Sequence, residues 1–271
     1  MSNKTTLIEM FEGFQTTPPL WHNDEIYGIN QFEPKKTNKQ FFTDIPNLNL
    51  RLGNWVEKFV SFQLKASPEA QILAENSQIK VNNETIGELD LLFYFNHEPL
   101  HMEVVYKFYL FDNKIVNDNY LDKWIGPNRK DTLVFKLKKL KEKQLPLLYH
   151  DGTIRLLNTL NVNRDDISQH TCFKAQLFLP YGQNISDIGP INNNCIIGEY
   201  LNFDDLNKLR DFYFYIPSKL DWLCNPKIEV EWKSFEDIKH PIDNLISKYR
   251  SPLCWVKTPE KELKKIFVTW W

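Results

Sequence analysis

The stretch "TIGELDLLFYFNHEPLHMEVVYKFYL", residues 85–110, decides the fold of this chain. Leu, Phe, Val and Tyr dominate two runs that are separated near Asn96 and His97. Alternate residues of a β-strand share one face, so Leu89 and Val104 can face a core. The stretch therefore predicts a β-hairpin with one apolar and one polar face.

The polar residues of this hairpin carry its possible chemistry. Glu88 and Asp90 point the same way, as do Glu103 and Lys107. If the strands pair, the acidic faces converge, and close carboxylates repel one another unless a cation neutralises them. Mg²⁺ prefers such oxygen ligands, lowers the pKa of bound water and stabilises charge on a phosphate. A neighbouring lysine can position water or stabilise the transition state.

A simpler interpretation of the same hairpin stays open. A strand face on which Glu and Lys alternate is most often solvated and carries a cross-strand ion pair. Short motifs of this kind arise often without function. The hairpin alone does not decide between the two interpretations.

The composition bounds the class of protein. The chain has 271 residues, of which 42% are hydrophobic and 14% aromatic, so it forms one large domain or two small ones. Only 9 glycines occur, and neither GxGxxG nor GxxxxGK[ST] is found, which excludes a glycine-rich nucleotide cradle. The formal net charge of −2 neither supports nor rejects a polyanionic partner.

The four cysteines are far apart, with no CxxC spacing: Cys172, Cys195, Cys224 and Cys254. This argues against a zinc site and a disulfide framework, and favours free thiols in a reducing cytoplasm. The sequence shows no apolar run of the ~18–20 residues that a membrane span needs. We therefore expect a cytoplasmic protein without a membrane partner.

Hydrophobic spacing predicts helices over 5–14 and 50–65, and another that stops before Pro146. Extended runs flank the "VNNET" turn, and the second half holds short apolar strands, including "KIEVEWKSF", with a helix near 236–249. This order of elements predicts an α/β fold around a mixed central β-sheet flanked by helices.

The segment from "LGNWVEKF" through "TIGELDLLF" to "LHMEV" resembles the PD-(D/E)XK nuclease superfamily. By position, Glu57 matches the glutamate of the first helix, Asp90 the metal-binding aspartate and Glu103 the acid of the third motif. Gly87 and Glu88 match the residues just before the aspartate. The resemblance implies a restriction-endonuclease-like core.

The lysine departs from the superfamily pattern. That pattern places it two residues after the glutamate, where this chain has Val105. Lys107 keeps the same face but is displaced by ~7 Å along a regular strand. "TIGELDLLF", "HMEVVYKFYL" and "WIGPNRKDTLVFKLKKLKEKQLPLL" together resemble the bacterial family catalogued as domain of unknown function 1853, in which the spacing is also E-x-x-x-K.

The resemblance implies a three-part organisation. Residues 1–48 form an N-terminal arm of helix and loop, and residues 49–149 the nuclease-like core. Residues 150–271 form a strand-rich C-terminal extension that packs on the core within one continuous domain.

Residues 127–149 are the most basic stretch of the chain. Charge runs on amphipathic helices are usually solvated faces, but this one follows the hairpin directly. Phosphate contacts there would give a salt-dependent affinity for DNA. The candidate nucleic-acid-binding residues are Arg129, Lys130, Lys136, Lys139 and Lys143.

Other candidates have simpler explanations. The literal E-x-K from Glu231 to Lys233 is interpreted as a half-exposed strand, because no "GELD" strand precedes it. His97 and His101 flank the hairpin turn and are interpreted as turn and surface histidines. Outside its register with Asp90, Glu57 reads as a surface glutamate.

Three hypotheses follow. In the first, the protein is a divalent-metal-dependent nuclease in which Asp90 and Glu103 hold Mg²⁺ or Mn²⁺, helped by Glu57 or Glu88, while Lys107 orients the attacking water. In the second, the fold is kept without chemistry and binds nucleic acid. In the third, the aromatic-rich second half serves as a protein–protein module.

Overall fold

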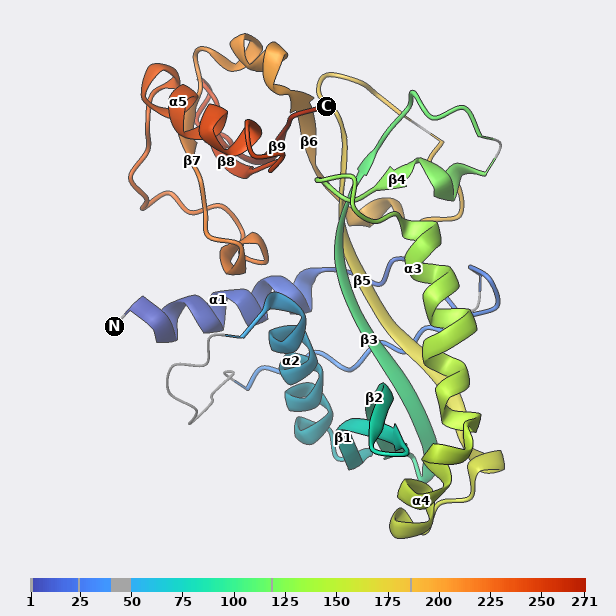
Figure 1. Ribbon diagram of the computed structural model, residues 1–271. Coiled ribbons are helices and arrows are strands. Elements are labelled where there is room, and N and C mark those ends of the chain that lie inside the picture. The colour runs from blue at the N-terminus through green and yellow to red at the C-terminus, as the bar shows by residue number, and fades with distance from the viewer. Residues whose placement is uncertain (1, 24, 40–49, 118, 186) are drawn as a thin grey trace. The chain divides into compact units, whose positions relative to one another are not determined.

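A computed structural model of the chain describes residues 2–23, 25–39, 50–117, 119–185 and 187–271 (Figure 1). These residues form two compact units, each assembled from separate segments. Unit 1 comprises Met1–Thr17, Lys107–Val134 and Ala175–Trp271, whereas unit 2 comprises Pro18–Tyr106 and Phe135–Lys174. The three-part division made from the sequence stays a prediction.

Two successive hairpins organise the strands of unit 2. β1 (Ala70–Val81) pairs with β2 (Glu84–Phe95) in antiparallel fashion, and β2 pairs with the start of β3 (Glu98–Phe111). The two residues of each connection, Asn82–Asn83 and Asn96–His97, have positive φ angles. Such angles are those of a two-residue type I′ turn, whose twist matches that of paired strands. The predicted strands and their turn are confirmed.

Helices pack against these strands. α2 (Leu52–Ala66) buries Trp55, Val56 and Phe59 and lies beside β1 (Figure 1). A second group comprises α3 (Leu133–Lys139), a π-helical turn (Leu140–Gln144), a 3₁₀ turn (Leu145–Tyr149) and α4 (Asp151–Leu160). The α- and π-helical residues end at Gln144, before Pro146 as predicted, and a 3₁₀ segment follows with Pro146 in its first turn, where a missing N–H costs nothing.

Unit 1 contains α1 (Ser2–Thr16) and strands from the second half of the chain. β6 (Ile196–Asn202) runs parallel to β9 (Leu263–Thr269). β8 (Leu253–Lys257) is antiparallel to β9 and also to β7 (Tyr213–Tyr215). The short β4 (Trp124–Ile125) pairs with β3.

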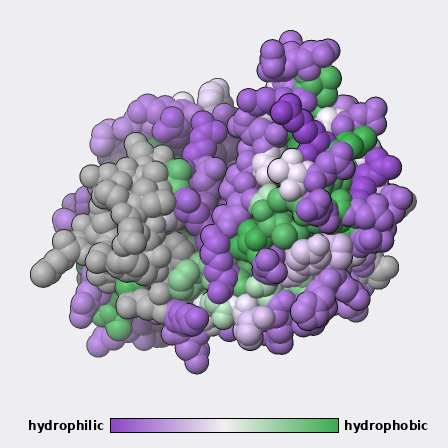
Figure 2. Space-filling view, turned by 90° about the horizontal axis from the view of Figure 1, so that it is seen from below, coloured by the Kyte–Doolittle hydropathy of each residue, from purple (hydrophilic) through white to green (hydrophobic). Residues whose placement is uncertain are grey.

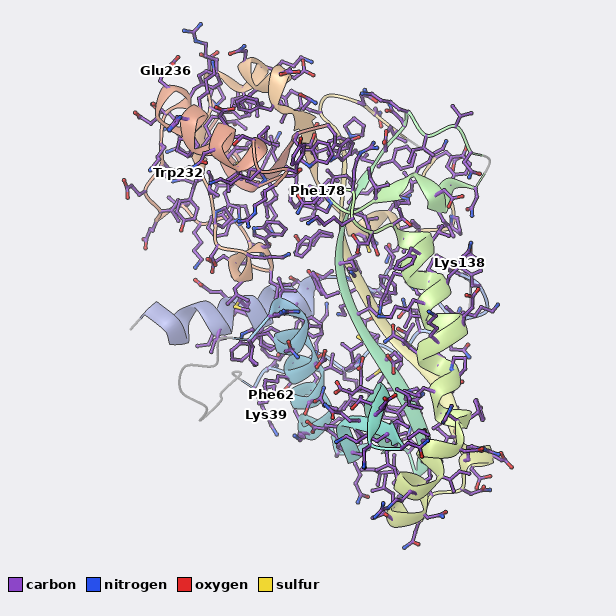
Figure 3. The ribbon with its side chains drawn as sticks, viewed as in Figure 1. Lys39, Phe62, Lys138, Phe178, Trp232 and Glu236 are labelled. Atoms are coloured by element: carbon purple, nitrogen blue, oxygen red, sulfur yellow. The ribbon has the colours of Figure 1, made fainter. Side chains whose placement is uncertain are left out.

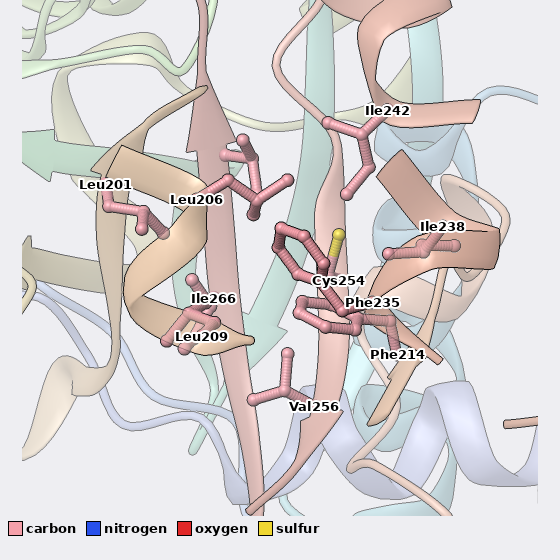
Figure 4. Close-up of a cluster of buried hydrophobic side chains, with 11 residues drawn as sticks. Leu201, Leu206, Leu209, Phe214, Phe235, Ile238, Ile242, Cys254, Val256 and Ile266 are labelled. Carbon is pink, nitrogen blue, oxygen red and sulfur yellow. The ribbon is translucent and has the colours of Figure 1, made fainter. Parts of the chain in front are cut away.

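α5 (Phe235–Ile246) covers these strands of unit 1. Ser234 caps its first turn by accepting a hydrogen bond from the backbone N–H of Asp237. Phe235, Ile238 and Ile242 then face Val256 and Ile266 in one buried cluster, shown in Figure 4. The helix predicted near 236–249 is confirmed.

The described strands form one mixed sheet of nine strands, in the order β1-β2-β3-β5-β6-β9-β8-β7 with β4 paired to β3. β3 and β5 (Ser168–Pro180) have residues in both units. The predicted mixed α/β sheet flanked by helices is confirmed.

The strand predicted in "KIEVEWKSF" is wrong, because residues 227–232 have no regular structure and Lys233 forms only an isolated bridge with Phe214. None of residues 228–233 is buried, so their alternation has no core to face. Trp232 instead donates its indole N–H to the carbonyl of Ile228.

Hydrophilic residues surround a smaller hydrophobic patch on the face shown in Figure 2. Among the described residues, none of the helices combines the length and the apolar character that crossing a membrane requires.

Close packing in unit 1 makes Gly198 sensitive to substitution. A Cβ atom there would lie 2.3 Å from the backbone oxygen of Lys265 and 2.8 Å from the ring of Phe178. We expect Gly198→Ala to destabilise the protein by about 1–3 kcal/mol, measured by denaturant unfolding.

Gly53→Ala is the matched control, since a Cβ atom on this residue of α2 meets nothing within 4 Å. It should be neutral or stabilise by up to about 1 kcal/mol. Equal unfolding midpoints for the two variants would contradict the described packing of β6 on β9.

Candidate active site

The candidate site lies where β2 diverges from β3. β2 pairs with β3 only from Leu91 onward, at the register Leu91 to Met102. Asp90, the preceding residue, accepts a hydrogen bond on Oδ2 from the backbone N–H of Val104 at 2.8 Å. The side chain thus takes the acceptor role that a strand carbonyl would have, and this bond fixes Asp90 at the fork.

Two further predicted carboxylates, Glu103 and Glu57, interact electrostatically with Asp90, and Glu88 interacts with Glu57. Burial, followed by the negative charges of Glu103 and then Glu57, raises the pKa of Asp90 to about 8, against the opposing effects of the Val104 N–H and Lys136. Burial also raises the pKa of Glu57, and the negative charges of Glu88 and Glu103 raise it further. Asn76 opposes this by donating a hydrogen bond to Glu57 at 2.8 Å. The structure therefore places Glu57, Glu88, Asp90 and Glu103 in one cluster of unit 2.

Glu103 is fully buried and held on both oxygens. Its Oε2 accepts a hydrogen bond from Nε2 of Gln144 at 2.5 Å, and its Oε1 lies 3.1 Å from Nε2 of His101. Thr171 donates its hydroxyl to the backbone oxygen of Glu103 at 2.9 Å. A buried carboxylate is stable only with such partners, so this shell fixes the orientation of Glu103.

The tautomer of His101 follows from its other neighbour. Gln169 donates Nε2–H to the carbonyl of Leu145 at 2.5 Å, and the same Nε2 lies 3.0 Å from Nδ1 of His101. An amide NH₂ group is only a donor, so Nδ1 accepts and the imidazole proton sits on Nε2, facing Glu103. His101 is 0% exposed, so its interpretation as a surface histidine is wrong, whereas His97 is an exposed turn residue as predicted.

The two lysines of interest lie in different units. Lys107 belongs to unit 1, where its Nζ lies 2.7 Å from Oδ2 of Asp131. Lys136 belongs to unit 2, where it interacts electrostatically with Asp90 and donates a hydrogen bond to Oε1 of Gln144 at 2.6 Å.

The other predicted nucleic-acid-binding residues divide similarly. Arg129, in unit 1, pairs with Asp112 and stacks on the ring of Trp271 at 4.1 Å. Lys130, also in unit 1, is exposed. Lys139 and Lys143 are exposed in unit 2, beyond the half-buried Lys136.

The donor set decides which metal ion the cluster could hold. In the part of the chain that the structure describes, no group of three or more His, Cys, Asp or Glu side chains is arranged to hold a metal ion. Mg²⁺, however, is usually bound by one or two carboxylates together with water and substrate phosphates. Asp90 and Glu103 have the donor chemistry of that kind of site, whereas the described residues offer no closed site with three protein ligands.

Sequence reasoning missed Gln144, Gln169 and the buried role of His101. His101 carried a usable signal, because it lies two residues before Glu103 and therefore on the same strand face. Gln144 carried no such signal, because on an ideal α-helix a residue eight positions after Lys136 is rotated by about 80° from it.

Comparison with known proteins places the chain in a family. No curated protein and no solved structure gives a significant match. The family model described as Domain of unknown function (DUF1853) matches residues 29–268. The chain belongs to the DUF1853 family. The resemblance to this family seen in the sequence is confirmed, and the matched DUF1853 region contains the whole carboxylate cluster.

Asp90 should make the stability of this DUF1853 protein depend on pH. Its pKa is about 8 in the folded state and near 3.8 ordinarily, so between these values the folded state holds a proton that the unfolded state has released. Stability therefore falls as pH rises through this window. Asp90→Asn resembles the protonated acid. At pH 8 it should raise Tm by several degrees, which corresponds to a gain on the order of 2 kcal/mol in the free energy of unfolding, and at pH 4.5 it should change Tm little.

Thermal unfolding across pH 4.5–8.5 measures this effect in buffers containing EDTA. Glu98→Gln, which changes an exposed carboxylate at the far end of the same hairpin, is the control and should leave the wild-type profile unchanged. A constant Tm difference between wild type and Asp90→Asn at every pH would show that Asp90 does not titrate in this window.

Proposed function

We propose that this DUF1853 protein is a divalent-metal-dependent phosphodiesterase that acts on DNA, with a restriction-endonuclease-like core of the PD-(D/E)XK type. One observation carries the proposal: the half-buried Asp90 and the fully buried Glu103 interact electrostatically at the fork between β2 and β3, and Glu57 is also close enough to interact with Asp90. Carboxylates held close together repel one another, and such an arrangement is typical of a site that binds a cation.

Asp90 and Glu103 would hold Mg²⁺ or Mn²⁺, and Glu57 and Glu88 would add to the negative potential that attracts the ion. When bound, such an ion neutralises charge on a phosphate and lowers the pKa of a coordinated water. Asp90 holds a proton near neutral pH, so it releases that proton as it becomes a ligand. In the net reaction, a water oxygen bonds to phosphorus, one ester P–O bond breaks, and the leaving oxygen takes a proton.

DNA would approach through basic side chains, which bind phosphates without reading sequence. Lys139 and Lys143 supply exposed charge on the helical segment that follows β3 and β4 along the chain. All four cysteines are free and buried, which supports action in a reducing cytoplasm.

A second candidate function is nucleic-acid binding without catalysis. Two observations favour it: the described residues offer no three-ligand metal group, and Lys107 is paired with Asp131. Metal binding and cleavage distinguish the two functions directly.

Mn²⁺ should raise the Tm of the wild-type protein and support cleavage of plasmid or labelled linear DNA. We expect Asp90→Asn and Glu103→Gln each to remove the thermal response and to lower cleavage at least 100-fold, because each loses a charged ligand. Glu98→Gln should behave as wild type. If wild type and Asp90→Asn respond equally to Mn²⁺, with no EDTA-sensitive cleavage, the non-catalytic function is correct.

DNA binding should depend on salt through the basic helical segment. Each phosphate contact contributes about 0.9 to the slope of log affinity against log salt concentration. In the absence of divalent metal, the double variant Lys139→Ala/Lys143→Ala should lower this slope by roughly 2, as measured by fluorescence anisotropy. Lys80→Ala, at an exposed lysine of β1, is the control. An unchanged slope in the double variant would exclude this segment from the DNA interface.

A further inference from the structure

Three side chains of unit 2 form a continuous hydrogen-bonded chain. Nζ of Lys136 donates to Oε1 of Gln144 at 2.6 Å, and Nε2 of Gln144 donates to Oε2 of Glu103 at 2.5 Å. An ammonium group can only donate, and a carboxylate can only accept. The amide of Gln144 is therefore fixed in one orientation, with its oxygen toward the cation and its nitrogen toward the anion.

Gln144 bridges the ammonium group of Lys136 and the carboxylate of Glu103 through these two hydrogen bonds. Lys136 also lies near enough to Asp90 to interact with it electrostatically.

The local helix geometry produces this alignment. On an ideal α-helix, a residue eight positions further along is rotated by about 80° from the first. The π-helical turn Leu140–Gln144 is wider than an α-helical turn and reduces that offset. Leu137 and Leu140 are fully buried and fix the segment, whereas Lys138 is exposed and extends outward from α3 (Figure 3).

We infer that Lys136 is the catalytic ammonium of the proposed phosphodiesterase and that Gln144 is the residue that positions it relative to Glu103. This inference rests on the proposed function and replaces the role expected for Lys107. Lys136 donates hydrogen bonds to the phosphate as negative charge develops on it, and it neither gains nor loses a proton. Lys107 is instead a structural partner of Asp131.

The test compares lysine variants in two measurements: Mn²⁺ affinity by isothermal titration calorimetry, and kcat and KM for cleavage of a DNA oligonucleotide with Mn²⁺. Lys136→Met should bind Mn²⁺ at least as tightly as wild type, because an ammonium is not a metal ligand. Its kcat should fall at least 100-fold, and Lys136→Arg should recover part of that loss. Lys107→Met and the matched control Lys138→Met should stay within 3-fold of wild type.

Gln144→Leu tests the positioning role separately. Because it removes a hydrogen bond to a metal-binding carboxylate, it should weaken Mn²⁺ binding 10–100-fold and also lower kcat. A purely structural role would lower Tm while leaving the Mn²⁺ affinity of the folded protein unchanged, and that result would overturn the assignment of Gln144.

The possible failures are distinguishable. If wild type binds Mn²⁺ and cleaves DNA, but Lys136→Met retains its kcat within 3-fold, the inference is wrong and the proposed function stands. A 100-fold loss in Lys107→Met would restore the role expected from the sequence and also overturn the inference. If wild type neither binds Mn²⁺ nor cleaves DNA, the proposed function fails, and the catalytic role of Lys136 fails with it.

Discussion

The hydrogen bond from the Val104 backbone to Asp90 is the interaction on which the candidate site depends. It forms at the residue where β2 stops pairing with β3. Asp90 there accepts the hydrogen bond of the Val104 N–H in place of a carbonyl of β2. A carboxylate is a strong acceptor for such a group, but Asp90 is half-buried, and a charge held partly away from water is costly. The bond therefore holds the half-buried acid at the fork.

Asp90 and Glu103 each reduce the free-energy cost of holding a carboxyl group away from water. Asp90 does so by holding a proton, because its pKa is raised to about 8. Glu103 does so through donors on both oxygens, from the amide of Gln144 and the imidazole of His101. Asp90 is thus neutralised by a proton, and Glu103 is stabilised by hydrogen bonds. A bound cation would displace the proton of Asp90, so that Asp90 binds the cation as a negatively charged carboxylate.

Local patterns in the sequence predicted much of this fold but only part of the site. Helical spacing identified α2, because its apolar residues share one buried face. Two-residue alternation and apolar runs identified the hairpins, although β3 is buried on both faces, as the consecutive buried residues Leu100, His101, Met102 and Glu103 show. The same alternation failed at Val230 and Trp232, where no core is present to receive the apolar side chains. The buried histidine was missed because its distance from the turn, rather than its strand face, was used to judge exposure.

The position of the proposed catalytic lysine could not be predicted from residue spacing along the sequence. Four residues of extended strand span ~13 Å, so Lys107 shares a strand face with Glu103 without sharing its surroundings. Lys136 lies 33 residues after Glu103 in the chain, and only the tertiary fold shows that Gln144 links the two side chains by hydrogen bonds. The π-helical turn that aligns Gln144 has no simple sequence signature, because its residues also suit an α-helix. The hydrogen-bonded link from Lys136 through Gln144 to Glu103 therefore depends on tertiary packing. The chemistry proposed for this site also depends on the fork that holds Asp90.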